Sequence, residues 1–302
     1  MKYDKSPMNY IGGKFKLLPQ ILPLFPKKIN TFLDIFAGGC DISANVSKLS
    51  SVERIHANDL NPFTIKFYKT MQRLSIETLL EKIEGIIETW QLSMYNKQGF
   101  MNFQNHYNLI PVDDRDPLEF FCLMAHSFNN QMRFNQKLDC VSSFGYRRSH
   151  FNPVMRDNLI KFHKNIQKIT FINLDFSDFH LDHLNESDFV YIDPPYRISN
   201  ADYNHGNAGF ARKWGIEDDL LLFKLLDQLN DQGVRWALSN ITEHKGMSNT
   251  ELAEWMTKYN VKILEKDYNH CNYQSKNRQF KTIEVLVTNY PLVRRSITLF
   301  PE

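Results

Sequence analysis

Short apolar runs alternate with amphipathic segments along most of the chain, which is the pattern of an α/β protein. The runs that we interpret as strands lie at 31–37, 54–59, 169–176, 188–193, 235–240, 261–268 and 282–290. Alternation of strands with helices favours a mostly parallel sheet with right-handed crossovers. The link at 269–281 is too short for a crossover helix, so the last two strands should form an antiparallel hairpin at one edge.

Helix signals lie between these strands. Asn61-Pro62 and Asn152-Pro153 are typical of an N-cap and a first helical turn, and capping-box spacing occurs at Asp116/Glu119 and Ser248/Glu251. Helical patterns over 63–126, followed by a polar, Arg-rich stretch, interrupt the strand alternation after the second strand. The sequence therefore predicts a sheet domain built from 1–62 and 166–302, with 63–165 as a mainly helical insertion.

Composition and charge set limits on the class of protein. A chain of 302 residues with 42% hydrophobic residues can bury a large core, and its net charge of +2 excludes nothing. Four scattered cysteines without a C-x-x-C pair argue against zinc, and we expect no metal and no disulfide framework. The chain has neither a signal-peptide pattern nor an apolar run of about 18 residues. We expect a cytoplasmic protein that does not enter a membrane.

A Gly-rich turn follows the first predicted strand. Asp34-x-Phe36-Ala37-Gly38-Gly39 lies where that strand turns into its helix, and Gly38-Gly39 would let the backbone approach a ligand closely. Asp59 follows 20 residues after Gly39, at the end of the second strand, where an acidic side chain can bind ribose hydroxyls. The turn is not G-x-G-x-x-G, which favours a nucleoside-type ligand without a pyrophosphate. Taken alone, a tight turn and a helix cap explain the same residues.

A second motif, Asp193-Pro194-Pro195-Tyr196, directly follows the buried strand at 188–193. One interpretation is that the prolines only end the strand. The chemistry of the motif also suits methylation of an exocyclic base amine, which is a poor nucleophile. Asp193 and the Pro194 carbonyl can each accept one N–H, and Pro195 stiffens the backbone. The two acceptors stabilise the positive charge that develops on the nitrogen, and Tyr196 offers an aromatic face to an extruded base.

At this point the chain resembles the N6-adenine DNA methyltransferases of the Dam type, the D12 class, over residues 8–290. The matching stretches follow the order of that family: YIGGK (10–14), FLDIFAGGC (32–40), NDLNP (58–62), FNNQMRFN (128–135), SFGYRR (143–148) and DPPY (193–196). The resemblance implies the methyltransferase fold and transfer of a methyl group from S-adenosylmethionine (AdoMet), with S-adenosylhomocysteine as product. It implies double-stranded DNA as partner and a flipped adenine in GATC or a GAT-containing site as target.

The resemblance also assigns residues to roles. Catalysis falls to Asp193, Pro194, Pro195 and Tyr196. The residues implied for the AdoMet pocket are Tyr10, Gly13, Lys14, Asp34, Phe36, Gly38, Asp59, Asp175, Phe176 and Asp193. Those implied for DNA are Asn9, Phe128, Asn129, Arg133, Asn135, Ser143, Tyr146, Arg147 and Arg148, with further phosphate contacts from Lys137, His150 and Arg156. Among them, Arg133 and Arg147 are the candidates to pair with guanine edges.

The recognition segment departs from the family pattern. Leu138-Asp139-Cys140 and Ser142-Ser143 replace a stretch that normally contains a proline, and Ser143 occupies the proline position. That proline offers an apolar contact to a thymine methyl, so its loss bears on the target sequence. Two other functions are weighed: methylation of a glutamine side chain or of RNA, whose enzymes typically carry Asn before the prolines, and a DNA-binding module without catalysis. A cognate restriction endonuclease acting without a stable complex, and a monomer or weak dimer, complete the expectations.

Overall fold

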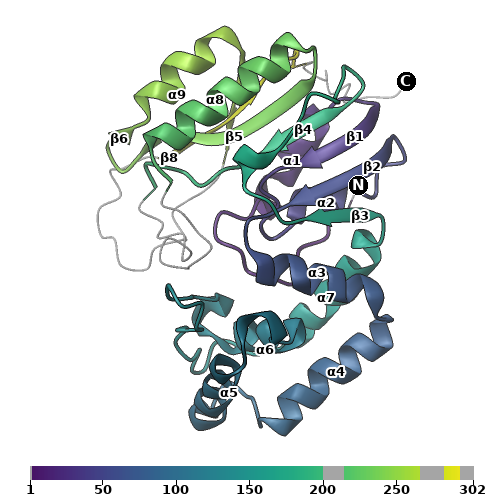
Figure 1. Cartoon of the computed structure of the whole chain (residues 1–302), viewed down its shortest axis with the longest axis vertical. Helices are drawn as coiled ribbons and strands as arrows, with labels where there is room; N and C mark the ends of the chain where they lie inside the picture. Colours follow the sequence, from purple (N-terminus) through teal and green to yellow (C-terminus); the bar gives the residue numbers. More distant parts are fainter. Residues whose placement is uncertain (1, 200–213, 266–281, 293–302) are drawn as a thin grey trace, which may run out of the picture.

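A mixed β-sheet flanked by helices forms the centre of the computed structural model, which describes residues 2–199, 214–265 and 282–292 (Figure 1). Seven strands follow one another in the order β3-β2-β1-β4-β5-β8-β7. They are β1 Ile29–Asp34, β2 Val52–Asn58, β3 Ile169–Ile172, β4 Phe189–Ile192, β5 Arg235–His244, β7 Asn260–Leu264 and β8 Thr282–Thr288. A two-residue strand, β6 (Met247–Ser248), also pairs with β5, and it is too short for periodicity to reveal.

The pairing confirms the predicted α/β methyltransferase-type sheet. Strands β3, β2, β1, β4 and β5 are mutually parallel, whereas β8 runs antiparallel to both β5 and β7. The last two strands therefore form the expected edge hairpin. The strand order reverses between β1 and β4, because β2 and β3 follow on one side of this pair and β5 follows on the other. A ligand site is expected beyond the carboxyl ends of such a pair.

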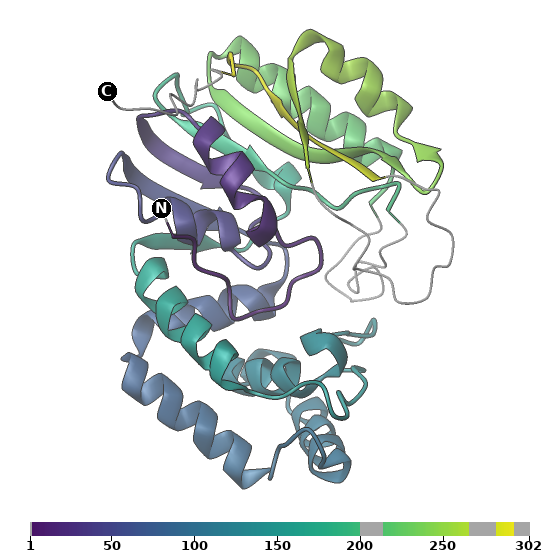
Figure 2. The same cartoon turned by 180° about the vertical axis from the view of Figure 1, so that it is seen from behind.

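Helices cover both faces of the sheet, as the two opposite views show (Figures 1 and 2). One apolar cluster joins α8 (Ile216–Asp231) and α9 (Thr250–Trp255) to the strands through Leu222, Leu226 and Trp236. A second cluster on the other face includes residues of α1 (Leu18–Ile21), α2 (Asp41–Val46) and α7 (Pro153–Ile166). Burial of this kind on both faces explains why the β4 sequence FVYI is apolar without alternation.

Most predicted helix starts are confirmed by their caps. Asn61 accepts from the N–H groups of Phe63 and Thr64 at the start of α3 (Pro62–Arg73). Asp116 caps α6 (Pro117–His126) and Asn152 caps α7 in the same way. The expected cap at Ser248 is wrong, because Ser248 still belongs to β6. Asn249 caps α9 instead, through the N–H of Leu252.

The predicted third strand is too long at its carboxyl end. Residues 173–176 leave the sheet because the backbone of Leu174 bonds to a side chain instead of a strand. The Asn58 side chain accepts the Leu174 N–H at 2.9 Å and donates to the Leu174 carbonyl at 3.0 Å. The chain then forms a short 3-10 turn over Phe176–Asp178. The other 3-10 turns of the described ranges are Phe15–Leu17, Leu22–Leu24, Val112–Asp114, Phe128–Asn130 and Met256–Lys258.

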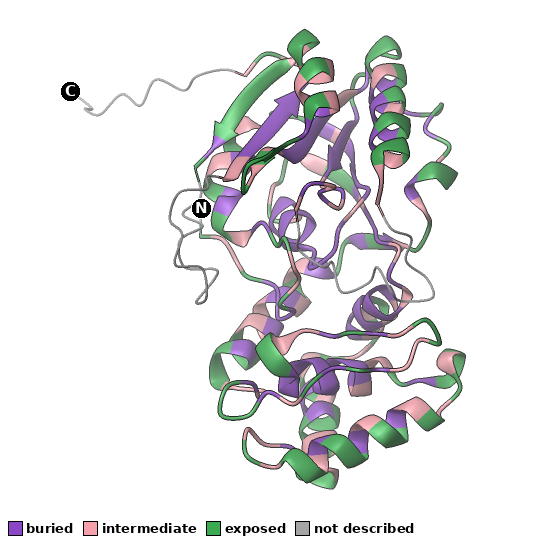
Figure 3. Ribbon diagram, turned by 90° about the vertical axis from the view of Figure 1, so that its left-hand side faces the viewer, coloured by how far each residue is buried: buried purple, intermediate pink, exposed green. Residues whose placement is uncertain are grey.

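The helical insertion packs around α6. Eight of the ten α6 residues are buried, and the helix lies between α3, α4 (Ile76–Thr89) and α5 (Lys97–Leu109). Stacked rings join these layers, with Phe67 and Phe121 at 4.8 Å between centroids. The buried residues in Figure 3 continue from the sheet into these helices. The proposed boundaries at 62 and 166 therefore stay a prediction.

Two further features concern the chain as a whole. Within the described ranges, no helix has the length and apolar character needed to cross a membrane. Cys40, Cys122 and Cys140 are buried free thiols, and Cys271 lies outside the described residues.

Candidate active site

Asp193 stands directly after β4 and is held from two sides. Its Oδ2 lies 2.7 Å from the Lys14 Nζ, and its Oδ1 accepts a 2.8 Å hydrogen bond from the Tyr196 hydroxyl. Lys14 is 4% exposed and Asp193 16% exposed. Burial raises the pKa of Asp193, and the Lys14 ammonium opposes that rise. The fold thus joins two motifs that are almost 180 residues apart in the sequence.

Glu284, on β8, is a second carboxylate at this point, and sequence reasoning missed it. Its side chain is 1% exposed, and its Oε1 lies 3.2 Å from the Tyr196 hydroxyl and 3.5 Å from the Lys14 Nζ. The charge of Glu284 also raises the pKa of Asp193. The available signal was an acidic residue inside the apolar run TIEVLVT, on a strand whose last five residues are all buried.

The Gly-rich turn is covered by Tyr10. Gly38 has a φ of +49°, and a Cβ added there would lie 2.9 Å from two ring carbons of Tyr10. A side chain at this position would therefore be strained and would also collide with the ring. Gly13 donates its N–H to the Tyr10 carbonyl at 3.1 Å, which folds the 10–14 segment back onto the turn.

Asp59, at the end of β2, braces the same turn. Its Oδ2 accepts from the Gly38 N–H at 2.7 Å and its Oδ1 from the Asn61 N–H at 2.8 Å. The Tyr10 hydroxyl lies 3.5 Å from Oδ1. Burial raises the pKa of Asp59, and these donors oppose the rise. The carboxylate keeps acceptor capacity because each of its oxygens has two lone pairs.

Asp34, at the end of β1, has one oxygen in use and one without a partner. The Ser43 hydroxyl donates to its Oδ2 at 2.6 Å. Within the described residues, its Oδ1 is buried and has no hydrogen-bond partner. Burial raises the pKa of Asp34 to about 7, and the nearby charges of Asp193 and Asp59 add to the effect. An orphaned buried acceptor of this kind suits a cationic or N–H-bearing ligand.

Three aromatic side chains form a wall beside the turn. Phe36 lies 5.5 Å from Phe176 and 5.6 Å from Trp214, and the latter two lie 5.1 Å apart, between ring centroids. Trp214 was not predicted, since one aromatic residue before a helix carries no specific signal. Asp175 adjoins the wall, and its Oδ1 accepts from the N–H and hydroxyl of Ser177.

The wall and the catalytic motif share an anchor in α8. Asp219, 1% exposed, accepts a 2.8 Å hydrogen bond from the Trp214 indole N–H and a 2.9 Å ion-paired one from Arg197. Arg197 follows Tyr196 directly and also pairs with Glu251. This network fixes the chain that leaves the 193–196 motif against both α8 and α9.

The recognition segment folds back on itself after Gln131. Arg133 and Val141 are joined by a 2.8 Å backbone hydrogen bond, and Phe134 pairs with Cys140 in an antiparallel bridge. We call residues 131–143 the recognition hairpin. Asn135 serves its tip, where its Oδ1 accepts the N–H groups of Lys137 and Asp139.

Side chains from elsewhere in the insertion hold this hairpin in place, and sequence analysis did not predict their role. Arg115, 5% exposed, donates to the carbonyls of Ile110 and Leu138. Asn108 bonds both the N–H and the carbonyl of Cys140. Ordinary polar residues in helical segments gave no sign of this role.

Several residues expected to contact DNA lie together beside the hairpin. The Asn9 side chain donates to the Asn129 carbonyl at 2.7 Å, and Arg148 lies 3.4 Å from the Asn129 side-chain oxygen. The Arg148 guanidinium also lies 5.4 Å from the Phe128 ring centroid, and Phe128 is 45% exposed. The structure thus brings the N-terminal segment to the recognition segment.

The remaining residues of this group are placed differently. Arg147 lies over the Tyr146 ring at 5.1 Å, and Tyr146 also contacts Tyr95 edge-on. Ser143 is exposed on the hairpin. Arg156 lies 3.3 Å from Glu84 on the far part of the insertion.

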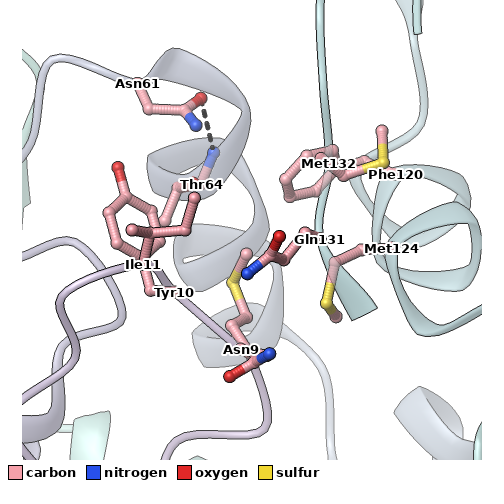
Figure 4. A pocket seen from close by; sticks show the side chains of 10 residues that line it. Asn9, Tyr10, Ile11, Asn61, Thr64, Phe120, Met124, Gln131 and Met132 are labelled. Atoms are coloured by element: carbon pink, nitrogen blue, oxygen red, sulfur yellow. Dashed lines mark hydrogen bonds between the residues drawn. The ribbon is translucent and has the colours of Figure 1, made fainter. Parts of the chain in front are cut away.

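A small cavity separates the N-terminal segment from the insertion (Figure 4). It measures about 30 Å³, and the residues that line it include Asn9, Tyr10, Thr64, Gln131 and Met132. A cavity of this size holds about one water molecule, and its lining brings residues of the Tyr10 segment and of the hairpin together.

Comparison with known proteins identifies the family. A model of the "D12 class N6 adenine-specific DNA methyltransferase" family matches residues 10–270. The modification methylase StsI of Streptococcus sanguinis is 42% identical over 293 residues, which cover 96% of this chain and 43% of that protein. The type II methyltransferase M.FokI of Planomicrobium okeanokoites is 40% identical over 293 residues, 95% of this chain and 43% of that protein.

Two further comparisons show lower sequence identity. The DNA N-6-adenine-methyltransferase of Escherichia phage P1 is 26% identical over 79% of this chain and 30% of that protein. A solved precorrin-6y C5,15-methyltransferase from Geobacter metallireducens has a TM-score of 0.33 and 14% identity, over 88% of this chain and 82% of that chain. The chain spans less than half the length of StsI and M.FokI. It belongs to the D12 class of N6 adenine-specific DNA methyltransferases.

Proposed function

We propose that the chain transfers the methyl group of AdoMet to the N6 amine of an adenine flipped out of double-stranded DNA, within GATC or a longer site containing GAT. The observation that carries the proposal is the Asp193 carboxylate, held at the end of β4 between Lys14 and Tyr196 beside the Gly-rich turn. An aspartate alone at a strand end would not need a buried ammonium beside it. Family membership supports the reaction class.

The residues present fit AdoMet. The Asp34 Oδ1, which accepts no hydrogen bond from the described part of the chain, suits the positively charged methionine end. The wall of Phe36, Phe176 and Trp214 suits a flat adenine ring. Asp59 retains acceptor capacity for ribose hydroxyls at the end of β2. Tyr10, Gly13 and Gly38 shape the turn around it. AdoMet supplies, when bound, an electrophilic methyl group.

The chain's own contribution is electrostatic and geometric. As the amine attacks, its nitrogen becomes positive, and the Asp193 carboxylate and Pro194 carbonyl accept its two N–H groups. Because Pro195 restricts the backbone, the Pro194 carbonyl stays aimed at the amine. Tyr196 holds Asp193 through its hydroxyl. Lys14 also lies 5.0 Å from the Tyr196 ring centroid, and we expect the flipped base to stack against the Tyr196 ring.

We assign DNA recognition to the insertion, residues 63–165, and catalysis to 1–62 with 166–302. Arg133, exposed on the recognition hairpin, is the candidate to pair with a guanine edge, with Arg147 as a second reader. Phe128 and Asn129 would enter the space left by the flipped base, and Arg148 would contact phosphate. A cognate endonuclease would act on the same site without a stable complex, with the methylase as monomer or weak dimer.

The proposal is tested by methylation of plasmid DNA with radiolabelled AdoMet, followed by sequencing that maps N6-methyladenine. Label confined to adenines within one recurring GAT-containing sequence is the expected result, and Asp193→Ala should abolish it. Methylation of adenines in a sequence without GAT would keep the chemistry and overturn the target. Label in RNA or protein but not in DNA would overturn the proposal itself.

A further inference from the structure

The side chains of the recognition hairpin divide into two faces. Because the two segments pair antiparallel through Phe134 and Cys140, Arg133 stands directly opposite Val141, and Met132 opposite Ser142. Met132, Phe134, Cys140 and Ser142 are buried. Arg133, Val141 and Ser143 alternate with these residues and are exposed, and we call these three residues the reading face.

Val141 is the apolar member of this face. It is 51% exposed, although its backbone N–H is firmly held by the Arg133 carbonyl at 2.8 Å. A single exposed valine is ordinary on a protein surface. Its position is what matters here, because it stands beside the arginine that we propose to read guanine.

The spacing of the pair is of the same order as that of neighbouring base pairs. Directly opposite residues on paired strands have Cβ atoms about 4.5–5.5 Å apart, and successive base pairs are stacked about 3.4 Å apart. A two-stranded ribbon fits the major groove. With Arg133 on one base pair, Val141 therefore falls on the next. In that groove the C5-methyl of thymine is the apolar group that distinguishes the bases.

We propose that Val141 is a specificity-determining residue, which contacts the C5-methyl of a thymine next to the base pair read by Arg133. The inference rests on the proposed function, since it needs a methylated site.

The experiment uses the site found by methylation mapping and replaces its thymines by deoxyuridine, one at a time on either strand. Deoxyuridine lacks only the methyl group. For the wild-type chain, kcat/KM should fall about four-fold at one thymine, the factor expected for one buried methyl group. Val141→Ala should be slower on the unmodified duplex and should treat thymine and deoxyuridine at that position alike.

A matched control is Val261→Ala, which removes the same atoms from a 40% exposed valine on β7. It should retain the wild-type response to deoxyuridine. A wild type indifferent to every replacement, or a Val141→Ala variant with undiminished sensitivity, would overturn the assignment. Normal methylation of the unmodified duplex in the same experiment would leave the proposed function intact, so the two failures are distinguishable.

Discussion

Asp34→Asn should change how the stability of the protein depends on pH. The side chain is 1% exposed, and burial together with nearby carboxylates raises the pKa of Asp34 from 3.8 to about 7. The folded state therefore holds this proton more tightly than the unfolded state. Its contribution to the free energy of unfolding is fully present below about pH 4 and is lost as pH rises through about 7.

The expected size follows from the shift. One pKa unit corresponds to about 1.4 kcal/mol, so ionised Asp34 costs roughly 4 kcal/mol of stability above pH 7, as an order of magnitude. Asparagine keeps the shape but cannot ionise. The free energy of unfolding of Asp34→Asn relative to wild type should therefore rise by about 1.4 kcal/mol per pH unit between pH 4 and 7, and then level off.

The assay is urea denaturation of both chains at half-unit pH steps from 4.5 to 8.5. Using the difference between the chains removes the titration of groups that the substitution leaves unaltered. A difference that stays flat with pH, or that falls as pH rises, would refute the reasoning. Repeating the series with AdoMet adds a second check: a cation paired with Asp34 lowers its pKa, so the slope should diminish.

Further substitutions probe separate parts of the site. Asp193→Ala should lower kcat by roughly 10²-fold or more while DNA binding persists, because it removes a charged acceptor, as single-turnover and gel-shift assays can check. Glu284→Gln should also lower kcat. Because the Glu284 charge raises the pKa of Asp193, the substitution should also shift the acid limb of the pH–rate profile to lower pH. An acid limb at the same pH as in the wild type would leave Glu284 a structural role only. In the described ranges, the charged or titratable groups that interact with Asp193 include Lys14, Asp34, Tyr191, Tyr196 and Glu284. Asp59→Ala should weaken AdoMet binding by about 1.5–3 kcal/mol, and equilibrium dialysis with unchanged affinity would remove Asp59 from the pocket. Arg133→Ala should cost about 1–3 kcal/mol on the cognate site and much less where that base pair is altered, whereas a uniform loss in methylation kinetics would make it a phosphate contact.

The sheet was predictable because its information is local. Apolar runs set the strands, and Asn61 and Asn152 mark helix starts through bonds to residues two or three positions away. The misplaced cap at Ser248 has an equally local cause, since a two-residue strand leaves no periodic trace and moves the cap to Asn249. The overlong third strand depends instead on the side chain of Asn58, more than a hundred residues distant.

The candidate site was predictable as far as it consists of motifs at strand ends. Asp34 ends β1, whereas Asp59 and Asp193 directly follow β2 and β4, and their convergence follows from the parallel pairing of these strands. Glu284 was not predicted because its strand, β8, runs antiparallel to β5 and contributes a residue near its beginning rather than at its end. Trp214 escaped because its partners, Phe36 and Phe176, come from two other segments.

Four carboxylates therefore meet at one end of the sheet, and three of them have a raised pKa because burial disfavours their charge. Stability alone would favour apolar side chains at such positions, since buried charge is costly. Arrangements that cost stability persist where function needs them. Under the proposed function, Asp193 would face the amine as it becomes positive. The Asp34 oxygen that has no hydrogen-bond partner among the described residues would suit a cationic cofactor. The buried negative charge that destabilises the chain without ligand is also the property that would let the chain bind a positively charged ligand.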